Sequence, residues 1–458
     1  MSNERSEWTR RRVVATGGAA IVGGLAGCGG LTGDGGSDEL VAHERFGDGD
    51  TALTYQTSTF YTPIEDESDQ PAAAPAIRTQ HEEWAENHSD YRIEVKYPAF
   101  GEWKNNLLTR AAEGDPPDGS TLDSKWVADF YQYLQPLNDH VDDGAIDDFF
   151  PFVRETAMQD GDLLAAWKYT GCRCLYYRQD VLDTYNDGDP PETWPELVSV
   201  GGDIADNEDM DAYMFQSSTA LANLPYFWSL GGELVDSEGA PVLGEDGNRA
   251  ALVGALEFIG ELVDTGVTPQ RVASVEEVEV LPREGRNGNL AMFVGNQDQI
   301  ERNLKNPIEE DDDVPDDQWE RWKVAKIPRP EDGEHTTGVG GWTEGAFIEG
   351  DGEDADAMKA FIAKHAEPES MARYCDAAGF LPTRESVYDL DAYDPSSPYL
   401  DRFREFLQDG IARPAFPIYS TIESEYVTAI ENVITGQSDP ESAADTVITR
   451  VNEEYEAS

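Results

Sequence analysis

The sequence predicts an α/β fold in which helices alternate with the strands of layered, parallel sheets. Strands at 52–56 and 91–95 flank a helix at 76–87, and this strand–helix–strand order is typical of a parallel sheet. Farther along, residues 172–177 alternate in character with a period of two, which indicates a strand with two differently occupied faces. At 458 residues, the chain is long enough for two or three domains with substantial cores.

Turn and capping signals place the remaining elements. In chain order, these are a helix at 103–113, a helix from Val181, a helix from Thr193, a short strand within 230–236, a helix at 251–263 ending before Gly266, a strand at 288–296 and a helix at 421–435. Two of the helices carry a capping-box pattern, in which a side chain at the helix start and a glutamate three residues later satisfy exposed amides. Thr193 with Glu196 and Ser420 with Glu423 have this spacing.

The acidic composition narrows the functional classes. The chain has 92 Asp and Glu against 33 Lys and Arg, a net charge of −59, and the acidic residues are spread along its whole length. A field of this sign repels nucleic acid and anionic headgroups. Such a surface also repels itself unless concentrated salt screens it, which indicates a halophilic source. With 92 carboxylates, no nearby pair of acids is by itself a sign of acid–base catalysis.

The amino terminus has the pattern of an export signal. Arginines at 10–12 precede a small, apolar run at 15–26, which is too short to span a bilayer. The paired arginines resemble a twin-arginine signal, and Leu25-Ala26-Gly27-Cys28 resembles a lipobox, so residues 1–28 are predicted to be a signal that leaves Cys28 lipidated. The alternative is a cleaved soluble signal with an incidental cysteine. Residues 29–50 are rich in Gly, Asp and Ser and are predicted to form a flexible tether.

Signatures of catalysis, cofactors and metals are missing from the sequence. H-E-x-x-H, G-x-S-x-G and the phosphate-binding G-x-x-x-x-G-K-[ST] do not occur, and none of the six histidines has metal-ligand spacing with a cysteine. These absences favour a binding protein over an enzyme. Cys172 and Cys174 share one strand face, so either one could bridge to Cys375, or all three could remain buried thiols.

Several motifs resemble the extracellular solute-binding proteins of ABC importers, in the sugar-binding branch that includes maltodextrin- and trehalose-binding proteins. In order, the motifs are Gly114–Gly119, Leu134–Leu137, Tyr176–Leu182, Pro190–Leu197, Leu230–Asp236 and Gly338–Trp342. The resemblance covers nearly all of residues 51–450. It implies a two-lobed, periplasmic-binding-protein-like (type II) fold with hinge strands. The chain departs from the family pattern at Gly119-Ser120, where the family usually continues with aliphatic residues.

The resemblance also implies where the lobes and hinges lie. Residues 51–170 and 341–380 would form the first lobe, and residues 171–340 and 381–458 the second. The backbone would cross between them near 169–173, 338–342 and 379–384. The hinge residues would be Gly171, Gly340, Gly341 and Gly379, since glycine can absorb a change in φ and ψ.

Sugar capture is the function that the resemblance implies. A monomer tethered by its lipid to the outer face of the membrane would bind a sugar between its lobes and deliver it to the permease of an ABC importer, without a cofactor and without catalysis. Sugars need aromatic platforms and paired polar groups. The predicted stacking residues are Trp126, Trp167, Tyr226 and Trp342, the predicted hydrogen-bonding residues are Gln56, Asp123, Asn296 and Asp298, and Tyr169 and Tyr419 are further predicted ligand contacts. Each aromatic could equally pack in a core.

Three other functions stay open at this stage. A surface-anchored glycoside hydrolase would need two carboxylates across a cleft and would turn over sugar. A binder of a polyamine or another cation would suit the acidic field. A structural surface lipoprotein would bind no solute. The acidic run at 309–313 is predicted to be a solvated loop rather than a cation site.

Overall fold

A computed structural model describes residues 44–68, 70–98, 103–275, 280–305, 307, 316–348, 350, 352–394 and 397–457. The chain divides into a unit of residues 1–39 and a unit of residues 40–458. The predicted export signal, Cys28, most of the predicted tether and the acidic run at 309–313 lie outside the described residues.

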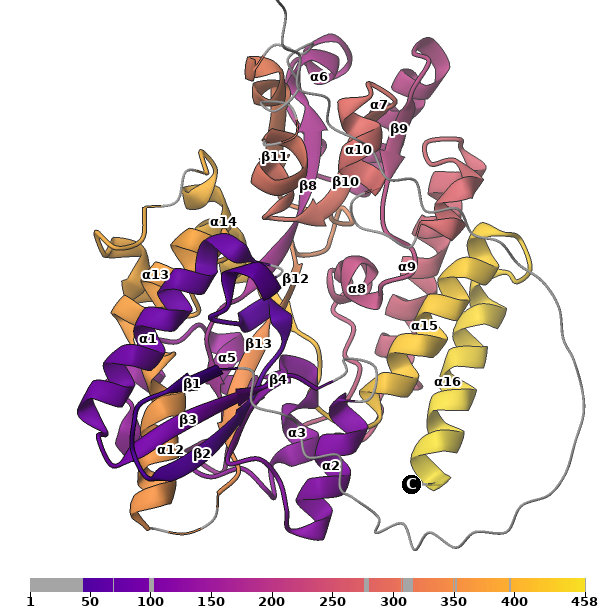
Figure 1. Cartoon of the computed structure of the whole chain (residues 1–458). Helices are drawn as coiled ribbons and strands as arrows, with labels where there is room; N and C mark the ends of the chain where they lie inside the picture. Colours follow the sequence, from indigo (N-terminus) through magenta and orange to yellow (C-terminus); the bar gives the residue numbers. More distant parts are fainter. Residues whose placement is uncertain are drawn as a thin grey trace, which may run out of the picture. The chain divides into compact units, whose positions relative to one another are not determined.

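The first lobe is built on a six-stranded sheet with the order β1–β3–β2–β4–β13–β7 (Figure 1). Its strands are β1 (Glu44–Phe46), β2 (Thr51–Gln56), β3 (Tyr91–Lys96), β4 (Gly119–Asp123), β7 (Ala166–Trp167) and β13 (Trp342–Ala346). The strand–helix–strand prediction is confirmed, because β2 pairs in parallel with both β3 and β4. The outer strands β1, β13 and β7 add antiparallel pairs that the sequence did not predict.

The predicted tether is wrong for its last residues. Glu44–Phe46 form β1, which pairs with Ile93–Val95 of β3, and Phe46 is buried in the core. A short strand with one apolar residue leaves little alternation to detect in the sequence.

The second lobe has a sheet with the order β14–β12–β8–β10–β9, and β11 pairs with β8 as well. Its strands are β8 (Gly171–Arg178), β9 (Asp211–Met214), β10 (Leu290–Asn296), β11 (Trp322–Ala325), β12 (Thr337–Gly340) and β14 (Gly410–Ala412). A separate two-stranded sheet joins β5 (Met158–Gln159) to β6 (Asp162–Leu163). The strands expected at 172–177 and 288–296 are confirmed as β8 and β10, whereas 230–236 contributes only the isolated bridge of Val235 with Pro241.

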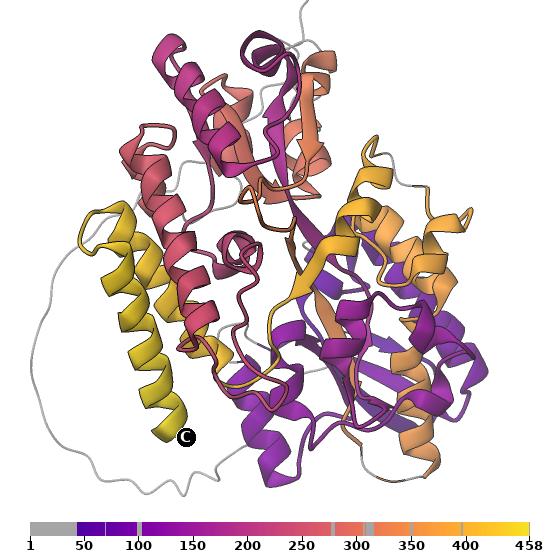
Figure 2. The ribbon, with the colours of Figure 1, turned by 180° about the vertical axis from the view of Figure 1, so that it is seen from behind.

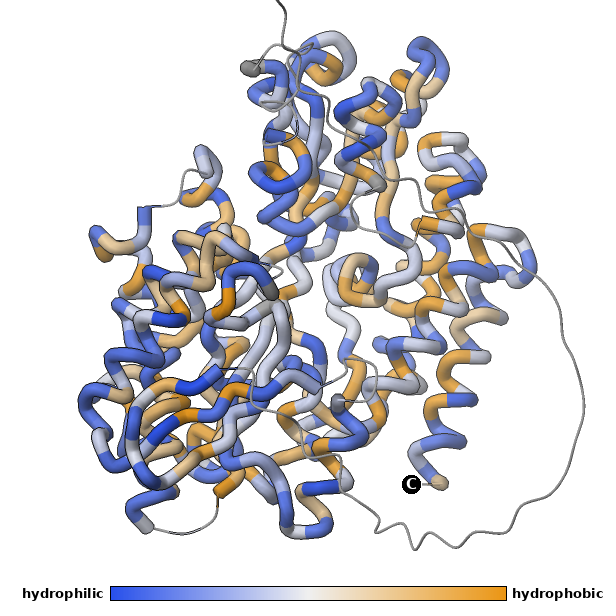
Figure 3. The backbone as a smooth tube through the Cα atoms, viewed as in Figure 1, coloured by the Kyte–Doolittle hydropathy of each residue, from blue (hydrophilic) through white to orange (hydrophobic). Residues whose placement is uncertain are grey.

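Helices cover both sheets. Around the first sheet lie α1 (Ala74–Asn87), α2 (Trp103–Glu113), α3 (Val127–Phe130), α4 (Ala145–Asp148), α5 (Pro151–Ala157), α12 (Glu353–Lys364) and α13 (Pro368–Ala378). The second lobe has α6 (Gln179–Tyr185), α7 (Trp194–Asn207), α8 (Ala220–Trp228), α9 (Asp246–Asp264), α10 (Val280–Arg286), α15 (Tyr419–Ile434) and α16 (Pro440–Ala457), and α14 (Leu400–Phe406) packs against β8. Hydrophobic and hydrophilic residues alternate along α9, α15 and α16, as expected of helices with one buried face (Figure 3).

Neither of the two predicted capping boxes is complete. Thr193 caps α7 as predicted, accepting a hydrogen bond of 3.4 Å from the amide of Glu196, but Oε2 of Glu196 accepts from the amide of Glu192 instead of that of Thr193. Helix α15 instead begins at Tyr419 and has no side-chain cap, so Ser420 lies inside its first turn. Glu423, which would complete the pattern at Ser420, pairs with Lys125 instead.

The backbone crosses between the two sheets at three places. It passes from β7 into β8 at 168–170, returns from β12 into β13 at Gly341, and reaches the second sheet again at β14, beyond which it continues into α15 (Figure 2). The third crossing was expected at 379–384. There Leu381 forms a bridge with Thr170 and Arg384 with Phe149 of the first lobe, and Gly379 is the left-handed C-cap of α13.

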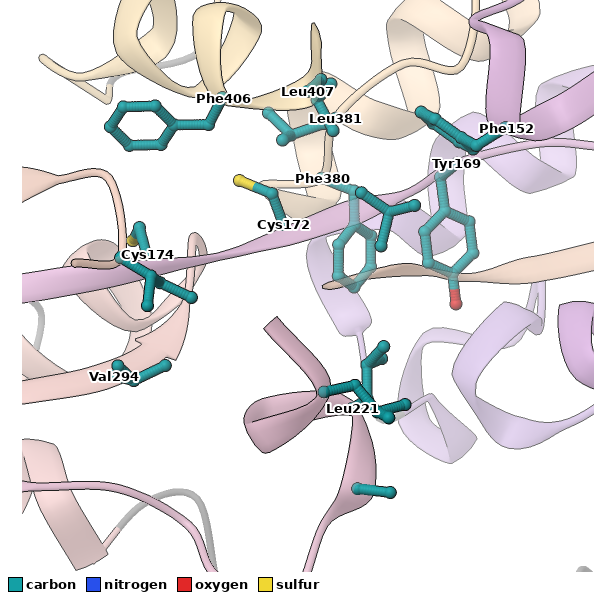
Figure 4. Close-up of a cluster of buried hydrophobic side chains, with 14 of the residues drawn as sticks. Phe152, Tyr169, Cys172, Cys174, Leu221, Val294, Phe380, Leu381, Phe406 and Leu407 are labelled. Carbon is teal, nitrogen blue, oxygen red and sulfur yellow. The ribbon is translucent and has the colours of Figure 1, made fainter. Parts of the chain in front are cut away.

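Two of the hinge glycines are closely packed. A Cβ atom on Gly341 would lie 2.1 Å from the carbonyl oxygen of Tyr169, and one on Gly171 would lie 2.5 Å from Oε1 of Gln297. Beside them the Tyr169 ring stacks on Phe380 with centroids 4.4 Å apart (Figure 4). At Gly341 the neighbouring atom is backbone and cannot move aside, so this position needs glycine whether or not the hinge moves, whereas at Gly171 the neighbour is the end of a side chain.

Two general findings concern the described residues. Cys172, Cys174 and Cys375 are free and buried, so neither Cys172 nor Cys174 forms a disulfide with Cys375. Across the same part of the chain, no helix has the length and apolar character needed to cross a lipid bilayer.

A candidate binding site between the two lobes

Asp123 joins the lobes through an ion pair. It is the last residue of β4, and it caps the following turn η5 (Ser124–Trp126) by accepting a hydrogen bond of 3.2 Å from the amide of Lys125. Its Oδ1 also lies 2.8 Å from Nη2 of Arg413, which follows β14 of the second lobe. Gly340 leaves room for this guanidinium, because a Cβ atom there would lie 3.2 Å from Nη2.

A second ion pair, between Lys125 and Glu423, joins the lobes two residues after Asp123. Nζ of Lys125 lies 2.7 Å from Oε2 of Glu423 on α15, and both side chains are about one quarter exposed. Glu423 thus contacts the other lobe and does not cap its own helix. Tyr419 is buried in the preceding turn, and its pKa is raised by burial and, next, by the charge of Glu423.

Three tryptophans of the first lobe gather beside Asp123. Trp342 begins β13 and is the direct strand partner of Asp123. Its ring stacks on Trp103 with centroids 5.4 Å apart, and Trp126 lies edge-on to Trp342 at 5.7 Å and to Trp103 at 6.0 Å. Trp103 is buried, whereas Trp126 and Trp342 are only partly so. The structure therefore brings an aromatic surface and a carboxylate together at the end of the first sheet.

Polar side chains of the second sheet lie near the same hinge. Arg173 on β8 is the strand partner of Asn296, the last residue of β10. Asp298 follows and is 9% exposed, and its Oδ2 lies 3.4 Å from Nη1 of Arg302. Burial raises the pKa of Asp298, while Arg302 and Arg173 oppose the shift. Among the described residues, Oδ1 of Asn296 and Oδ1 of Asp298 are buried without a hydrogen-bond partner.

Four predicted site residues lie elsewhere. Trp167 is fully buried in the first lobe against Phe152, and Tyr226 is buried in the second lobe with its hydroxyl on Tyr213. Both are core residues here, which corrects their prediction as stacking faces. Tyr169 is 4% exposed in the hinge, where it stacks on Phe380. Gln56 is buried at the carboxyl end of β2, beside β4 but without a bond to the groups above.

Sequence reasoning missed several members of this constellation. Arg173 was predicted only as part of a strand, Glu423 only as part of a helix cap and Trp103 only as a helix start, and Lys125 and Arg413 were not among the predicted contacts. The strand register that pairs Asp123 with Trp342 joins residues more than 200 positions apart, so no local pattern reports it. No group of His, Cys, Asp and Glu suited to a metal ion occurs in the described part of the chain.

A family model described as bacterial extracellular solute-binding protein matches residues 79–397, which is more than half of the chain. The chain belongs to this family. The resemblance drawn from the sequence motifs is therefore confirmed at the level of the family.

Solved structures share the fold of this solute-binding protein. The cyclic α-maltosyl-1,6-maltose binding protein of Arthrobacter globiformis matches with a TM-score of 0.71 at 20% identity, over 88% of this chain and 98% of that one. Maltose-bound MalE3 of T. maritima matches with 0.69 at 22% identity, over 88% and 99%. The sugar-binding protein MalE of Xanthomonas citri matches with 0.72 at 22% identity, over 88% and 97%. The two-lobed, periplasmic-binding-protein-like (type II) fold is thus confirmed.

Proposed function

We propose that this solute-binding protein captures a sugar between its two lobes and delivers it to the permease of an ABC importer. The observation that carries the proposal is the joining of the lobes beside an aromatic cluster: Asp123 pairs with Arg413 next to Trp126 and Trp342. Sugars present apolar C–H faces that stack on indole rings and hydroxyls that bond to carboxylate and guanidinium groups. The structural neighbours that bind maltose and cyclic α-maltosyl-1,6-maltose support the same class of ligand.

The capture mechanism follows from the positions of these groups. The tryptophans and Asp123 belong to the first lobe, whereas Arg413, Asn296 and Asp298 belong to the second. A ligand touching both sets makes all of its contacts only when the lobes are closed, so its binding shifts the hinge equilibrium towards the closed form. The permease would recognise that form. Chemistry on the ligand is not part of this mechanism.

We propose that the first lobe comprises residues 44–170 and 341–384, that the second comprises residues 171–340 and 410–458, and that the protein acts as a monomer. The lipid on Cys28 would hold it at the outer face of the membrane and raise its concentration near the permease. A single acyl chain anchors a protein weakly, so a second acyl chain or an unusual lipid is part of the proposal. The acidic surface suits a halophilic host, where molar salt screens repulsion over a Debye length of about 3 Å.

Binding of sugars to the purified protein in molar salt tests the proposal. Isothermal titration with maltose, other neutral oligosaccharides, acidic sugars and polyamines should give saturable binding of one sugar class and no release of products. Sugar turnover would favour a surface hydrolase, and binding of a polyamine alone would favour a cation binder. No binding of any of these solutes would contradict the proposal.

A further inference from the structure

Arg173 stands out because its guanidinium makes no close ion pair in a chain full of acids, although the charge of Asp298 acts on it from farther away. The chain has nearly three Asp or Glu for each Lys or Arg. Within the described residues, the guanidinium of Arg173 nevertheless forms no hydrogen bond and no ion pair of 4 Å or less; only its backbone is bonded, to Thr337. It is partly buried on β8, directly after the hinge crossing. A guanidinium has five N–H donors, so this position has unused bonding capacity for a ligand.

A second guanidinium lies close by: Nη2 of Arg413 would be 3.2 Å from a Cβ atom on Gly340, and Gly340 is the strand partner of Gly171, two residues before Arg173. Burial and, next, the like charge of Arg413 lower the pKa of Arg173 to about 10, and Asp298 opposes the shift. Nη2 of Arg413 donates a hydrogen bond to Asp123, but Nε of Arg413 is buried without a partner among the described residues. Two neighbouring guanidinium groups repel each other, and an anion between them would remove that cost.

Two oxygen acceptors without hydrogen-bond partners lie at the end of β10 and just after it, beside Arg173. Asn296 is the direct strand partner of Arg173, and the buried carboxylate of Asp298 follows two residues later. Each has one buried oxygen without a hydrogen-bond partner in the described part of the chain. Oxygen acceptors suit the hydroxyl groups of a polyol, whereas paired guanidiniums suit the two oxygens of a carboxylate or phosphate. Donors for an acid group and acceptors for hydroxyls are therefore adjacent.

We propose that the ligand is an acidic carbohydrate, whose carboxylate or phosphate group is bound by Arg173 and Arg413 while its hydroxyl groups donate to Asn296 and Asp298. This inference rests on the proposed function, since it names the chemical class of the sugar. It differs from the neutral sugars in the names of the structural neighbours. In a molecule with a net charge of −59, such a site needs a local concentration of cations to accept an anion.

Titration of matched ligands tests the inference. The probes are maltotriose as the neutral sugar, an oligogalacturonate and glucose 6-phosphate as acidic sugars, and inorganic phosphate as an anion without a sugar, each in 1 M and 3 M KCl. We expect an acidic sugar to bind at least about tenfold more tightly than maltotriose, because hydrogen bonds between charged partners are the stronger ones. The two acidic arms separate recognition of carboxylate from recognition of phosphate.

Variants sharpen the test. Arg173→Gln should weaken binding of the acidic sugar by about tenfold or more and leave the weaker binding of maltotriose within about twofold. The matched control is Arg249→Gln, which removes an arginine paired with Asp445 on the surface of α9 and should change neither affinity. If Arg173→Gln does not fold, the comparison of ligands on the unmodified protein still decides.

The outcomes separate the two proposals. Equal or tighter binding of maltotriose overturns the acidic ligand and leaves sugar capture standing. Binding of phosphate without binding of any sugar supports the arginine pair as an anion site but overturns sugar capture and with it the acidic carbohydrate. No binding of any probe overturns both. Equal loss of neutral and acidic affinity in Arg173→Gln also overturns the role of this arginine in charge recognition.

Discussion

Asp123 contacts its own lobe and the other lobe at once. It ends β4, caps the following turn through the amide of Lys125, and pairs with Arg413 across the lobes. Its strand partner Trp342 brings the tryptophan cluster to the same edge of the sheet. The carboxyl ends of parallel strands meet at one edge, and in open α/β sheets that edge is where ligands bind. Because Asp123 lies at this edge, it can contact both the tryptophans of its own lobe and Arg413 of the other lobe.

Removing the Trp342 ring should weaken ligand binding with little effect on folding. Trp342→Ala removes a partly buried stacking face, and we expect affinity for the ligand to fall by about tenfold, since aromatic stacking contributes about 0.5–1.5 kcal/mol beyond area burial. Titration calorimetry measures this loss, and a thermal melt checks the fold. Tyr455→Ala on α16 is the aromatic control and should bind normally. Unchanged affinity in Trp342→Ala would exclude the indole from the site.

The ion pair of Lys125 with Glu423 should contribute to closure, weakly and in a salt-dependent way. Lys125→Gln and Glu423→Gln should each weaken ligand binding, and the double variant should be no weaker than either one. Partly exposed pairs couple by about 0.2–1 kcal/mol, and salt reduces this. A double-mutant cycle on ligand affinity at 0.5 M and 3 M KCl measures the coupling. Additive losses, or a coupling that grows with salt, would contradict an attraction across the lobes.

Single residues show the limit of sequence reasoning most clearly. Trp126, Trp167 and Trp342 look alike in the sequence, yet only Trp126 and Trp342 lie in the cluster beside Asp123, while Trp167 is buried against Phe152. The difference depends on which side of a strand faces its neighbours after the sheet has formed, and pairing across long separations decides this. Ser420 and Glu423 have the spacing of a cap, but an ion pair with a distant lysine determines the role of the glutamate.

At the scale of elements, a buried charge network ties two crossing strands together. Lys168 precedes β8 and pairs with Glu344 of β13, and His365 at the end of α12 contacts the same carboxylate. Tyr55 donates a hydrogen bond of 2.5 Å to this carboxylate, and Nζ of Lys168 lies 3.1 Å above the ring of Tyr61. Every one of these groups is buried. The network therefore fixes the first-lobe ends of the strands that carry the chain into the second lobe.

Breaking this network should destabilise the protein strongly. Glu344→Gln removes the charge partner of Lys168, and loss of one member of a buried ion pair costs about 3–5 kcal/mol. Chemical denaturation at pH 7 measures the free energy of unfolding. The exposed Glu82→Gln on α1 is the control and should change it by less than about 0.5 kcal/mol. A variant Glu344→Gln as stable as the unmodified protein would show that the pair contributes nothing.

The carboxylate of Glu344 should also determine how the free energy of unfolding falls at acidic pH. Burial alone would raise the pKa of Glu344, but His365 and Lys168 outweigh it and lower the pKa to about 2 from 4.5. The native state then binds fewer protons than the unfolded state between these values. Stability from Glu344 is therefore complete above about pH 4.5 and is lost as the pH falls towards 2. Unfolding curves across this range should show a slope that Glu344→Gln reduces and Glu82→Gln retains.

Long elements with strong periodicity were predictable, and short ones were not. The helix at 251–263 and the strand at 288–296 follow from local pattern and correspond to α9 and β10. Strand β1 has three residues and β14 three more, so neither carries enough alternation to be detected. The third crossing was misplaced for this reason: β14 makes it, whereas the motif at 379–384 packs in the first lobe.

At the scale of the whole chain, the sequence motifs were sufficient for the fold. Their order along the chain predicted two lobes, and the structure has two sheets joined by three crossings. The chemistry of the ligand was beyond such motifs, because the groups proposed to bind it, Arg173 and Arg413, are far apart in sequence. The net charge of −59 makes concentrated salt the proper medium for every test of the molecule.

The most direct test of the account is small-angle X-ray scattering of the purified protein in concentrated KCl, with and without saturating ligand. If a solute binds by drawing the tryptophans of one lobe towards Arg173, Asn296 and Asp298 of the other, the radius of gyration must fall on binding. The Arg173→Gln variant should need more ligand to reach the same decrease. A ligand that binds tightly while the scattering curve stays unchanged would contradict capture by closure of the two lobes.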